Sequence, residues 1–461
     1  MPRGGIKVNA MRVVFPYIAM LLIATVGSPR MAAQQQMSKT SRESAETILQ
    51  TIAADIKKDY YDTKFHGLDW DAVVAQTRQK IDESGSFDMA LLHVAALVDS
   101  LNDSHTTLFP PQRVLNAPEG YVADWRSLLL LTDKKHDYGW ESQMIGERCY
   151  VTHVRPRSDA EKKGLQVGDE VLSINGYHPE RASIQQAEYV FNILRPQDEL
   201  KVEVVGPTGA KKQLTVKAKV QKVSPMSQYE QGARAIHASE DLDRTSKART
   251  VEFGDDLAIL KLPGFYLTFE AIQNWIDKER KRKALIVDLR DNHGGAEETL
   301  KHLLGDMFDH ELKIADRVMR TDRKPLMAKP GHPFEGKIVV LIDSNSMSAA
   351  EIFARVIQIE KRGVVMGDRS AGSVMEARYH TYQLSGSAIY YGVSITEADL
   401  VMADGKSLEH LGVTPDEILI PTASDLARGF DPVLSHAAET LGVKLSPEQA
   451  GKLFPYEWPP E

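Results

Sequence analysis

The sequence predicts an α/β protein with a largely parallel sheet, and three observations support this prediction. After residue 250, short apolar runs alternate with segments whose apolar residues recur at helical spacing. Such alternation is typical of parallel strands covered by helices. Before that point, residues 121–222 contain short strands and turn signals, and residues 44–102 have a helical pattern. The chain has 461 residues, which is enough for two or three domains.

The first 33 residues have the pattern of an export signal. They contain four basic residues, no acidic one, and an apolar stretch of 14 residues followed by small side chains. The stretch contains Pro16 and is shorter than the ~20 residues that span a bilayer. We therefore predict a cleaved signal peptide over residues 1–33 and an exported protein, periplasmic or secreted. Membrane contact is expected only if this segment is not cleaved.

Charge and cysteine content narrow the class of protein further. The net charge is −8, and removal of the basic N-terminal segment would make it more negative. This argues against nucleic acid and anionic membranes as partners. Cys149 is the only cysteine, so no intrachain disulfide can form. That composition suits a bacterial periplasmic protein better than a small secreted scaffold.

Residues 38–120 form the predicted N-terminal helical region. Two apolar stripes at helical spacing, within residues 48–56 and 91–101, predict helices. The second stripe runs into Asp103-Ser104-His105-Thr106. We expect Pro110 and Pro111 to stop regular structure soon afterwards. His105 thus lies just beyond a helix end, where a histidine is most simply a surface or capping residue.

Residues 121–222 are predicted to form a separate β-rich module. They contain the order S-x-A-x-x-x-G-L-x-x-G-D-x-V-L-x-I-N-G, and Gly206-Pro207-Thr208-Gly209 is a hairpin signal between two strands. This order resembles PDZ domains, which bind an extended peptide, often its C-terminus, by adding it to a sheet edge. The alternative is an ordinary β-sandwich-like insert.

A polar linker over residues 223–250 leads to the predicted α/β core over residues 251–425, and a C-terminal helical tail covers 426–461. Within these segments we expect strands at residues 257–262, 284–289, 337–342, 363–366, 388–395 and 417–420. Helices are expected at residues 268–281, 296–308, 349–360 and 432–441.

Ser348 lies at the junction of the strand at 337–342 and the helix that starts at 349. A strand, tight turn and helix expose a hydroxyl at a helix N-terminus, where free N–H groups and the helix dipole favour negative charge. The simpler interpretation of one serine before a helix is an N-cap. The register also leaves Ser344 and Ser346 open as the exposed hydroxyl.

Two other stretches carry polar residues at strand ends. The strand at 284–289 runs into D-L-R-D-N-H-G-G, in which Gly294 and Gly295 would let backbone N–H groups approach a ligand. A simple turn into the next helix is the alternative. Glu409 and His410 lie in a loop that leads to the strand at 417–420.

Together with the PDZ-like module, these stretches resemble the family of the C-terminal processing (tail-specific) and tricorn-type serine peptidases. The matching pieces are D-S-H-T, D-L-R-D-N-H-G-G, S-M-S-A-A-E-I-F, G-V-V-M-G-D-R-S-A-G and G-V-T-P-D, in the family's order. The resemblance implies a crotonase-like (ββα) peptidase core with the PDZ-like domain inserted. It also implies protein or peptide substrates, with C-termini recognised through that domain, and no cofactor.

One departure bears on the mechanism. The tail-specific branch pairs its serine with a lysine in a G-x-x-x-x-G-K pattern, but here Ser373 stands at the lysine position. The tricorn-type branch uses a serine, a histidine with a second serine beside it, and a glutamate. The resemblance therefore implies Ser348 as nucleophile, His105 as base, and Glu409 and Ser104 as the groups that orient it.

The chemistry agrees with this assignment. A serine hydroxyl needs a nearby base, and histidine takes and returns a proton near neutral pH. A carboxylate fixes the imidazole tautomer, directly or through a hydroxyl. We expect the N–H of Ala349 and an amide of Gly294-Gly295 to form the oxyanion hole, each such donor being worth about 3 kcal/mol.

Several alternatives stay open at this point. His410 and His293 are other candidate bases, Lys406 is the one lysine near a motif, and Glu351 is expected to be structural. A metal is not expected, because the sequence has no H-E-x-x-H motif and no cysteine–histidine cluster. The rival functions are a catalytically silent peptide-binding protein and an esterase-like hydrolase on the same scaffold.

Overall fold

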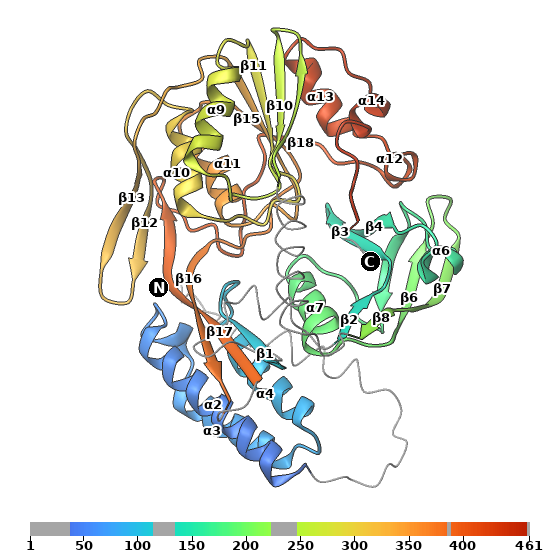
Figure 1. Ribbon diagram of the computed structural model, residues 1–461, viewed down its shortest axis with the longest axis vertical. Coiled ribbons are helices and arrows are strands. Elements are labelled where there is room, and N and C mark those ends of the chain that lie inside the picture. Colours follow the sequence, from blue (N-terminus) through green and yellow to red (C-terminus); the bar gives the residue numbers. More distant parts are fainter. Residues whose placement is uncertain (1–36, 114–133, 223–246, 385–388, 459–461) are drawn as a thin grey trace, which may run out of the picture.

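The computed structural model describes residues 37–113, 134–222, 247–384 and 389–458 (Figure 1). The predicted signal peptide lies outside the described residues. Within them, no helix is both long and apolar enough to cross a membrane.

The N-terminal helices form one end of the molecule in Figure 1. They are α2 (Lys39–Asp59), α3 (Trp70–Glu83) and α4 (Phe87–Asp99), with the short helix η1 (Phe65–Gly67) between the first two. Each α-helix begins at a side-chain cap, Ser38, Asp69 or Ser86, which satisfies a free N–H of the first turn. The stripe predicted in α2 is fully buried, as its spacing required.

The helical region ends in a strand, and our expectation for its two prolines was wrong. Strand β1 (Thr107–Arg113) contains Pro110 and Pro111 and pairs with β17 (Ile389–Met402). The two prolines lie where the register shifts, between the pairs made by Phe109 and Gln112. A bulge on a strand paired along one side is a place where residues without an N–H are tolerated.

A five-stranded sheet in the order β3-β4-β5-β6-β7 forms the PDZ-like module, beside a two-stranded sheet of β2 and β8. Strand β3 is therefore an edge of its sheet. The bounds are β2 (Lys134–Asp137), β3 (Trp140–Ile145), β4 (Arg148–Val154), α6 (Asp159–Lys162), β5 (Glu170–Ile174), α7 (Ile184–Tyr189), the π-helix η2 (Val190–Leu194), β6 (Glu199–Val205), β7 (Lys211–Lys217) and β8 (Lys219–Lys222).

The core sheet has the order β18-β15-β14-β11-β10-β9. All neighbours are parallel except β9 and β10, which confirms a largely parallel sheet. Its strands are β9 (Arg249–Phe253), β10 (Leu257–Lys261), β11 (Ala284–Asp288), β14 (Lys337–Ile342), β15 (Val364–Gly367) and β18 (Glu417–Ile418). Strand β9 begins inside the segment that we predicted as a linker, because Arg249 and Thr250 pair with the end of β10.

Helices cover both faces of this sheet (Figure 1). One core contains Ala258, Val287 and Val340 of the strands together with residues of α9 (Phe269–Glu279), α10 (Glu297–Gly305) and α11 (Ala349–Ile359). The alternate strand residues face α13 (Pro432–Thr440) and α14 (Pro447–Gly451), and α12 (Ala423–Arg428) precedes them. Strands buried on both faces consist almost entirely of apolar residues, and for this reason these strands could be predicted from the sequence.

A second sheet joins the helical region to the core, and the sequence did not predict most of it. Its order is β1-β17-β12-β13, and β16 pairs along the other side of β17. The unpredicted strands are β12 (Leu312–Met319), β13 (Arg323–Ala328) and β16 (Met375–Gln383). Strand β17 extends to Met402, beyond the predicted residue 395, and so reaches from β1 to β12.

Candidate active site

Ser348 lies between β14 and α11 in a strained conformation. Its φ is 52° and its ψ is −117°, a region that costs a non-glycine residue about 1–3 kcal/mol. The backbone N–H donates to the carbonyl of Ser373 at 2.9 Å and to Glu351 Oε2 at 3.0 Å. A serine held in this way at a strand-to-helix turn is typical of a nucleophile.

The two alternative serines have their hydroxyls in structural hydrogen bonds. Ser346 is fully buried, and its hydroxyl donates to the carbonyl of Leu289 at 2.8 Å. Ser344 is also buried, and its hydroxyl donates to the carbonyl of Met144 in the PDZ-like module at 2.5 Å. These bonds favour Ser348, which is half-buried, as the hydroxyl that reaches a substrate.

The paired glycines lie directly against Ser348. A Cβ on Gly294 would be 2.7 Å from the Cβ of Ser348 and 3.1 Å from the N of Ala349. The N–H of Gly294 donates to Asn292 Oδ1 at 2.8 Å. Among the residues that the structure describes, no hydrogen bond engages the N–H of Gly295 or of Ala349. Ala349 is the first residue of α11, where N–H groups have no partner within the helix.

Ser104, His105 and Glu409 form one hydrogen-bonded network, although 305 residues separate Ser104 from Glu409. The hydroxyl of Ser104 lies 2.9 Å from Glu409 Oε2 and 2.7 Å from His105 Nδ1. The N–H of Ser104 donates to Glu409 Oε1 at 2.7 Å. Because the hydroxyl donates its single hydrogen to the carboxylate, it accepts from Nδ1–H. This pattern assigns the neutral imidazole an unprotonated Nε2, the form that a general base needs.

Two consecutive residues connect this network to Ser348. The carbonyl of Ser373 accepts from the N–H of Ser348, and the N–H of Val374 donates to Glu409 Oε2 at 2.8 Å. Position 373, where the tail-specific branch has lysine, is therefore next to Ser348 in space, although the two residues belong to separate motifs. The side chain there is a buried serine, so a lysine base from this position is absent.

The other candidate bases have different surroundings. His410 is exposed, and its Nε2 lies 2.8 Å from the carbonyl of Asn102. His293 is exposed and pairs with Asp291. Lys406 is exposed in the turn that follows β17, where its carbonyl accepts from the N–H of Met402.

Burial governs the protonation of the network. Burial lowers the pKa of His105 below its ordinary value of 6.5, and the charge of Asp103 opposes this shift. Burial also raises the pKa of Glu409, against the effects of His410 and of two backbone N–H donors. The imidazole is therefore neutral at neutral pH and ready to accept a proton.

Glu351 is closer to the chemistry than the sequence suggested. Its carboxylate is fully buried in α11. Oε1 accepts from the hydroxyl of Ser370 at 2.6 Å and the N–H of Gly372 at 2.7 Å. Oε2 accepts the N–H groups of Ser348 and Ser373 at 3.0 and 2.9 Å. Burial raises its pKa to about 7. The S-x-x-E spacing from Ser348 to Glu351, a capping-box pattern, was the signal for this contact.

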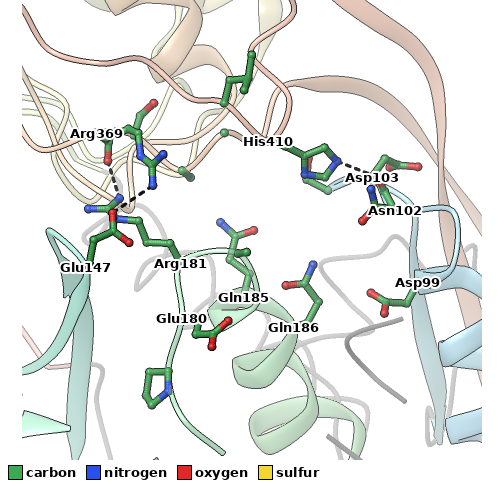
Figure 2. A pocket seen from close by; sticks show the side chains of 17 residues that line it. Asp99, Asn102, Asp103, Glu147, Glu180, Arg181, Gln185, Gln186, Arg369 and His410 are labelled. Carbon is green, nitrogen blue, oxygen red and sulfur yellow. Dashed lines mark hydrogen bonds and ion pairs between the residues drawn. The ribbon is translucent and has the colours of Figure 1, made fainter. Parts of the chain in front are cut away.

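A polar cavity of about 560 Å³ opens beside Ser104 (Figure 2), within the usual size range of ligand sites. The loop of residues 102–106, here called the histidine loop, forms one wall together with His410 through its residues 102–104. The PDZ-like module forms another wall through Arg181, Gln185 and Gln186. Residues 369–372 close it from the core side. Among the described residues, no cluster of three or more His, Cys, Asp or Glu side chains is placed to hold a metal.

The PDZ-like module is bonded to the loops that carry the site. Arg181 forms a buried ion pair with Asp368 and donates to the carbonyl of Arg369 at 2.9 Å. Gln143 of edge strand β3 donates to Asp343 Oδ2 at 2.7 Å. The module therefore contacts both the loop before Ser348 and the loop that contains Ser373.

These features indicate one class of protein, the serine-type peptidases. Comparison with known families gives the same result at the level of domains. Residues 256–419 match the family described as peptidase family S41, and residues 129–205 match the PDZ domain. Residues 256–419 are therefore similar to the S41 peptidases, and the resemblances to this peptidase family and to PDZ domains seen in the sequence are confirmed.

The relatives differ in how much of them this chain covers. A tail-specific protease of Haemophilus influenzae is 32% identical over 132 residues, which are 27% of this chain but only 19% of that protein. A chloroplastic C-terminal processing peptidase of Tetradesmus obliquus is 24% identical over 379 residues, 79% of this chain and 75% of the relative. The structure of mature CPAF aligns with a TM-score of 0.61 at 15% identity, over 84% of this chain and 95% of that one. This structural likeness shows the shared fold alone.

Proposed function

We propose that the protein is an exported serine endopeptidase that cleaves peptide bonds through an acyl-enzyme on Ser348. The observation that carries the proposal is the hydrogen-bonded Ser104–His105–Glu409 network, tied to Ser348 through residues 373 and 374. In this proposal Ser348 is the nucleophile, His105 the base, and Ser104 and Glu409 orient the imidazole.

The proposed reaction has two stages. Ser348 Oγ attacks the scissile carbonyl carbon while its proton moves to His105 Nε2, and the imidazolium then gives that proton to the leaving amine. Water attacks the acyl ester in the second stage, loses a proton to His105, and releases the acid and the serine hydroxyl. Ser104 and Glu409 stabilise the imidazolium that forms in each stage.

The N–H groups of Ala349 and Gly295 are the proposed oxyanion hole. Our sequence prediction left Gly294 and Gly295 open. The N–H of Gly294 already donates to Asn292, so we assign Gly294 a different part, which is to leave room beside Ser348. Donors of this kind are each worth about 3 kcal/mol in the transition state.

The substrate proposal is a protein or peptide whose C-terminus is recognised by the PDZ-like module. Edge strand β3 and helix α7 face each other across a small cavity of about 50 Å³, lined by Gln143, Met144, Ile184 and Gln185 among others. A peptide that adds to a sheet edge between a strand and a helix is the usual PDZ mode. His293 and Met347 of the active-site loops line the same cavity, so a bound peptide would lie close to the site.

Reaction with a fluorophosphonate probe tests the proposal, because only an activated serine forms the covalent adduct. We expect wild type to be labelled on Ser348, Ser348→Ala to be unlabelled, and the exposed-site control Ser424→Ala to react like wild type. No labelling of wild type would indicate the silent peptide-binding protein. Hydrolysis of short-chain esters without cleavage of casein would indicate the esterase.

Export, the domain limits and the crotonase-like core remain parts of the same proposal. The segment 1–33 would be removed, so that the mature chain begins between about residues 28 and 36. N-terminal sequencing of exported material checks this, and a retained Met1 would show an anchor. The proposed domains are residues 38–120, 121–222, 251–425 and 426–461, with 223–250 as the linker.

A further inference from the structure

Asp103 immediately precedes Ser104 and accepts four hydrogen bonds. Oδ1 accepts the N–H of His105 at 3.0 Å, the N–H of Thr106 at 2.7 Å and the hydroxyl of Thr396 at 2.6 Å. Oδ2 accepts the hydroxyl of Tyr60 at 2.8 Å. The two backbone bonds form a local turn around the aspartate, and the side-chain bonds attach that turn to distant elements.

Those distant elements are β17 and the end of α2. Tyr60 is the C-cap of α2 and is fully buried, and its hydroxyl also lies 2.9 Å from His66 Nε2. Burial and the charge of Asp103 raise the pKa of Tyr60, so the phenol stays protonated and donates. Thr396 belongs to β17, and its carbonyl accepts the N–H of Tyr61. The N-terminal helices are thereby connected to the histidine loop.

Asp103 also places a negative charge beside the imidazole. Its Coulombic effect opposes the lowering of the His105 pKa by burial. The other titratable groups of this region are Glu409 and His410 on the loop after β17, Asp399 of β17, Tyr60, Tyr61 and Asp62 directly after α2, and His66 of η1. Asp103 and Glu409 are the two carboxylates that accept hydrogen bonds from backbone N–H groups of the histidine loop.

We propose that Asp103 is a positioning residue that fixes Ser104 and His105 for catalysis and supplies a stabilising charge to the imidazolium, and that Tyr60 links the helical region to it. This inference rests on the proposed function of His105 as base. The physical reason is that a base must approach its proton in a narrow geometry, and a displacement of about 1 Å can cost about 100-fold in rate.

Asp103→Asn is the decisive variant because it keeps the shape and removes the charge. Oδ1 still accepts its three bonds, and the Tyr60 hydroxyl can accept from the new amide. We expect kcat to fall about tenfold at pH 8 with little change in KM. We also expect the acidic limb of the pH profile to move to lower pH by about half a unit or more, because an opposite charge no longer favours the imidazolium.

Tyr60→Phe removes only the hydroxyl. It should lower kcat by a smaller factor, about threefold, and leave the acidic limb at the wild-type pH because the carboxylate remains. Asp71→Asn, the same chemical change at an exposed carboxylate paired with Lys57, is the matched control and should behave as wild type. A purely structural part for Asp103 would lower the folded fraction without moving the limb.

The outcomes separate the two proposals. An inactive His105→Ala together with a wild-type rate and limb in Asp103→Asn would overturn this inference and leave the proposed function intact. An active His105→Ala would overturn the proposed function itself. If Asp103→Asn does not fold, Tyr60→Phe decides the question, and a wild-type kcat in that variant would contradict the link to the helical region.

Discussion

The Ser348 turn and the Ser104–His105 loop are held in place by different means. The turn belongs to one strand–turn–helix unit whose own carboxylate, Glu351, lies three residues after Ser348, and its other partners are in the nearby segment 370–373. The loop depends on distant residues: Glu409 is 305 positions from Ser104, and Thr396 is 293 positions from Asp103. One half of the site is therefore specified by local sequence and the other by the packing of separate elements.

This difference sets what each kind of change should do. A substitution at the turn changes the structure of one compact unit. A substitution near the histidine loop can also change the positions of the several distant elements that contact it. Segment 373–374 joins the halves, since one residue bonds to Ser348 and the next to Glu409. The predictions that follow test each half and then their connection.

The largest effect should come from removing either reacting group. Ser348→Ala and His105→Ala should each lower kcat by about 10⁴-fold or more, and the double variant should be little worse, because nucleophile and base act as a unit. Steady-state kinetics on a peptide substrate measures this. Lys406→Ala is the control and should stay near wild type. A large loss of kcat in Lys406→Ala together with an active His105→Ala would show that the base is a lysine and not the histidine.

Glu409→Gln should have an intermediate effect, about 100-fold in kcat. The single amide oxygen can accept either from the N–H of Ser104 or from the Ser104 hydroxyl and the N–H of Val374, and the charge that stabilises the imidazolium is lost. The same variant should show little change in KM, since Glu409 acts through Ser104 and His105. A rate equal to that of wild type would mean that the histidine loop does not need its distant carboxylate.

The pH dependence should show a tenfold loss of rate for each unit below the pKa of the base. Burial lowers the pKa of His105 below 6.5, so activity should rise with pH and level off by about pH 7. The same shift affects stability: protonation of His105 favours unfolding, so its contribution is present above 6.5 and is lost as pH falls toward the folded-state pKa. A rise centred near pH 10 would indicate a lysine.

Glu351→Gln tests the turn and should reduce kcat by about tenfold. A glutamine has one acceptor oxygen, so its NH₂ group must face either the N–H pair of Ser348 and Ser373 or the donors on Ser370 and Gly372. Buried donors without acceptors cost about 1–3 kcal/mol each, and thermal unfolding should show the loss. Wild-type stability with full activity would contradict a positioning role for this carboxylate.

The sequence predicted the local half of this site more directly than the distant half. An apolar run, a polar turn and helical spacing were enough to place Ser348 at the start of α11. The core strands were predictable for the same reason, since burial on both faces makes them continuously apolar. Glu351 was assigned only a structural role, because its S-x-x-E spacing is also that of an ordinary capping box.

The distant half needed the family resemblance. Nothing in the spacing of His105 and Glu409 reveals that they meet. Only the first half of β17 was predicted, and its partners β12 and β16 carry mixed polar patterns that do not stand out as strands. The prolines of β1 concealed the strand that follows His105, since a bulge tolerates them where a regular ladder would not. Both the meeting of His105 with Glu409 and the formation of β1 depend on pairing between strands that are far apart in the sequence.

The smallest effect should come from the connection between the site and the PDZ-like module. Ser344→Ala removes one hydrogen bond, from Ser344 to the carbonyl of Met144, and should cost about 1 kcal/mol of stability. Because Ser348 keeps its own contacts, kcat should change less than about threefold and fluorophosphonate labelling should persist. Loss of labelling in this variant would identify Ser344 as the nucleophile and would mean that Ser348 is only a helix cap.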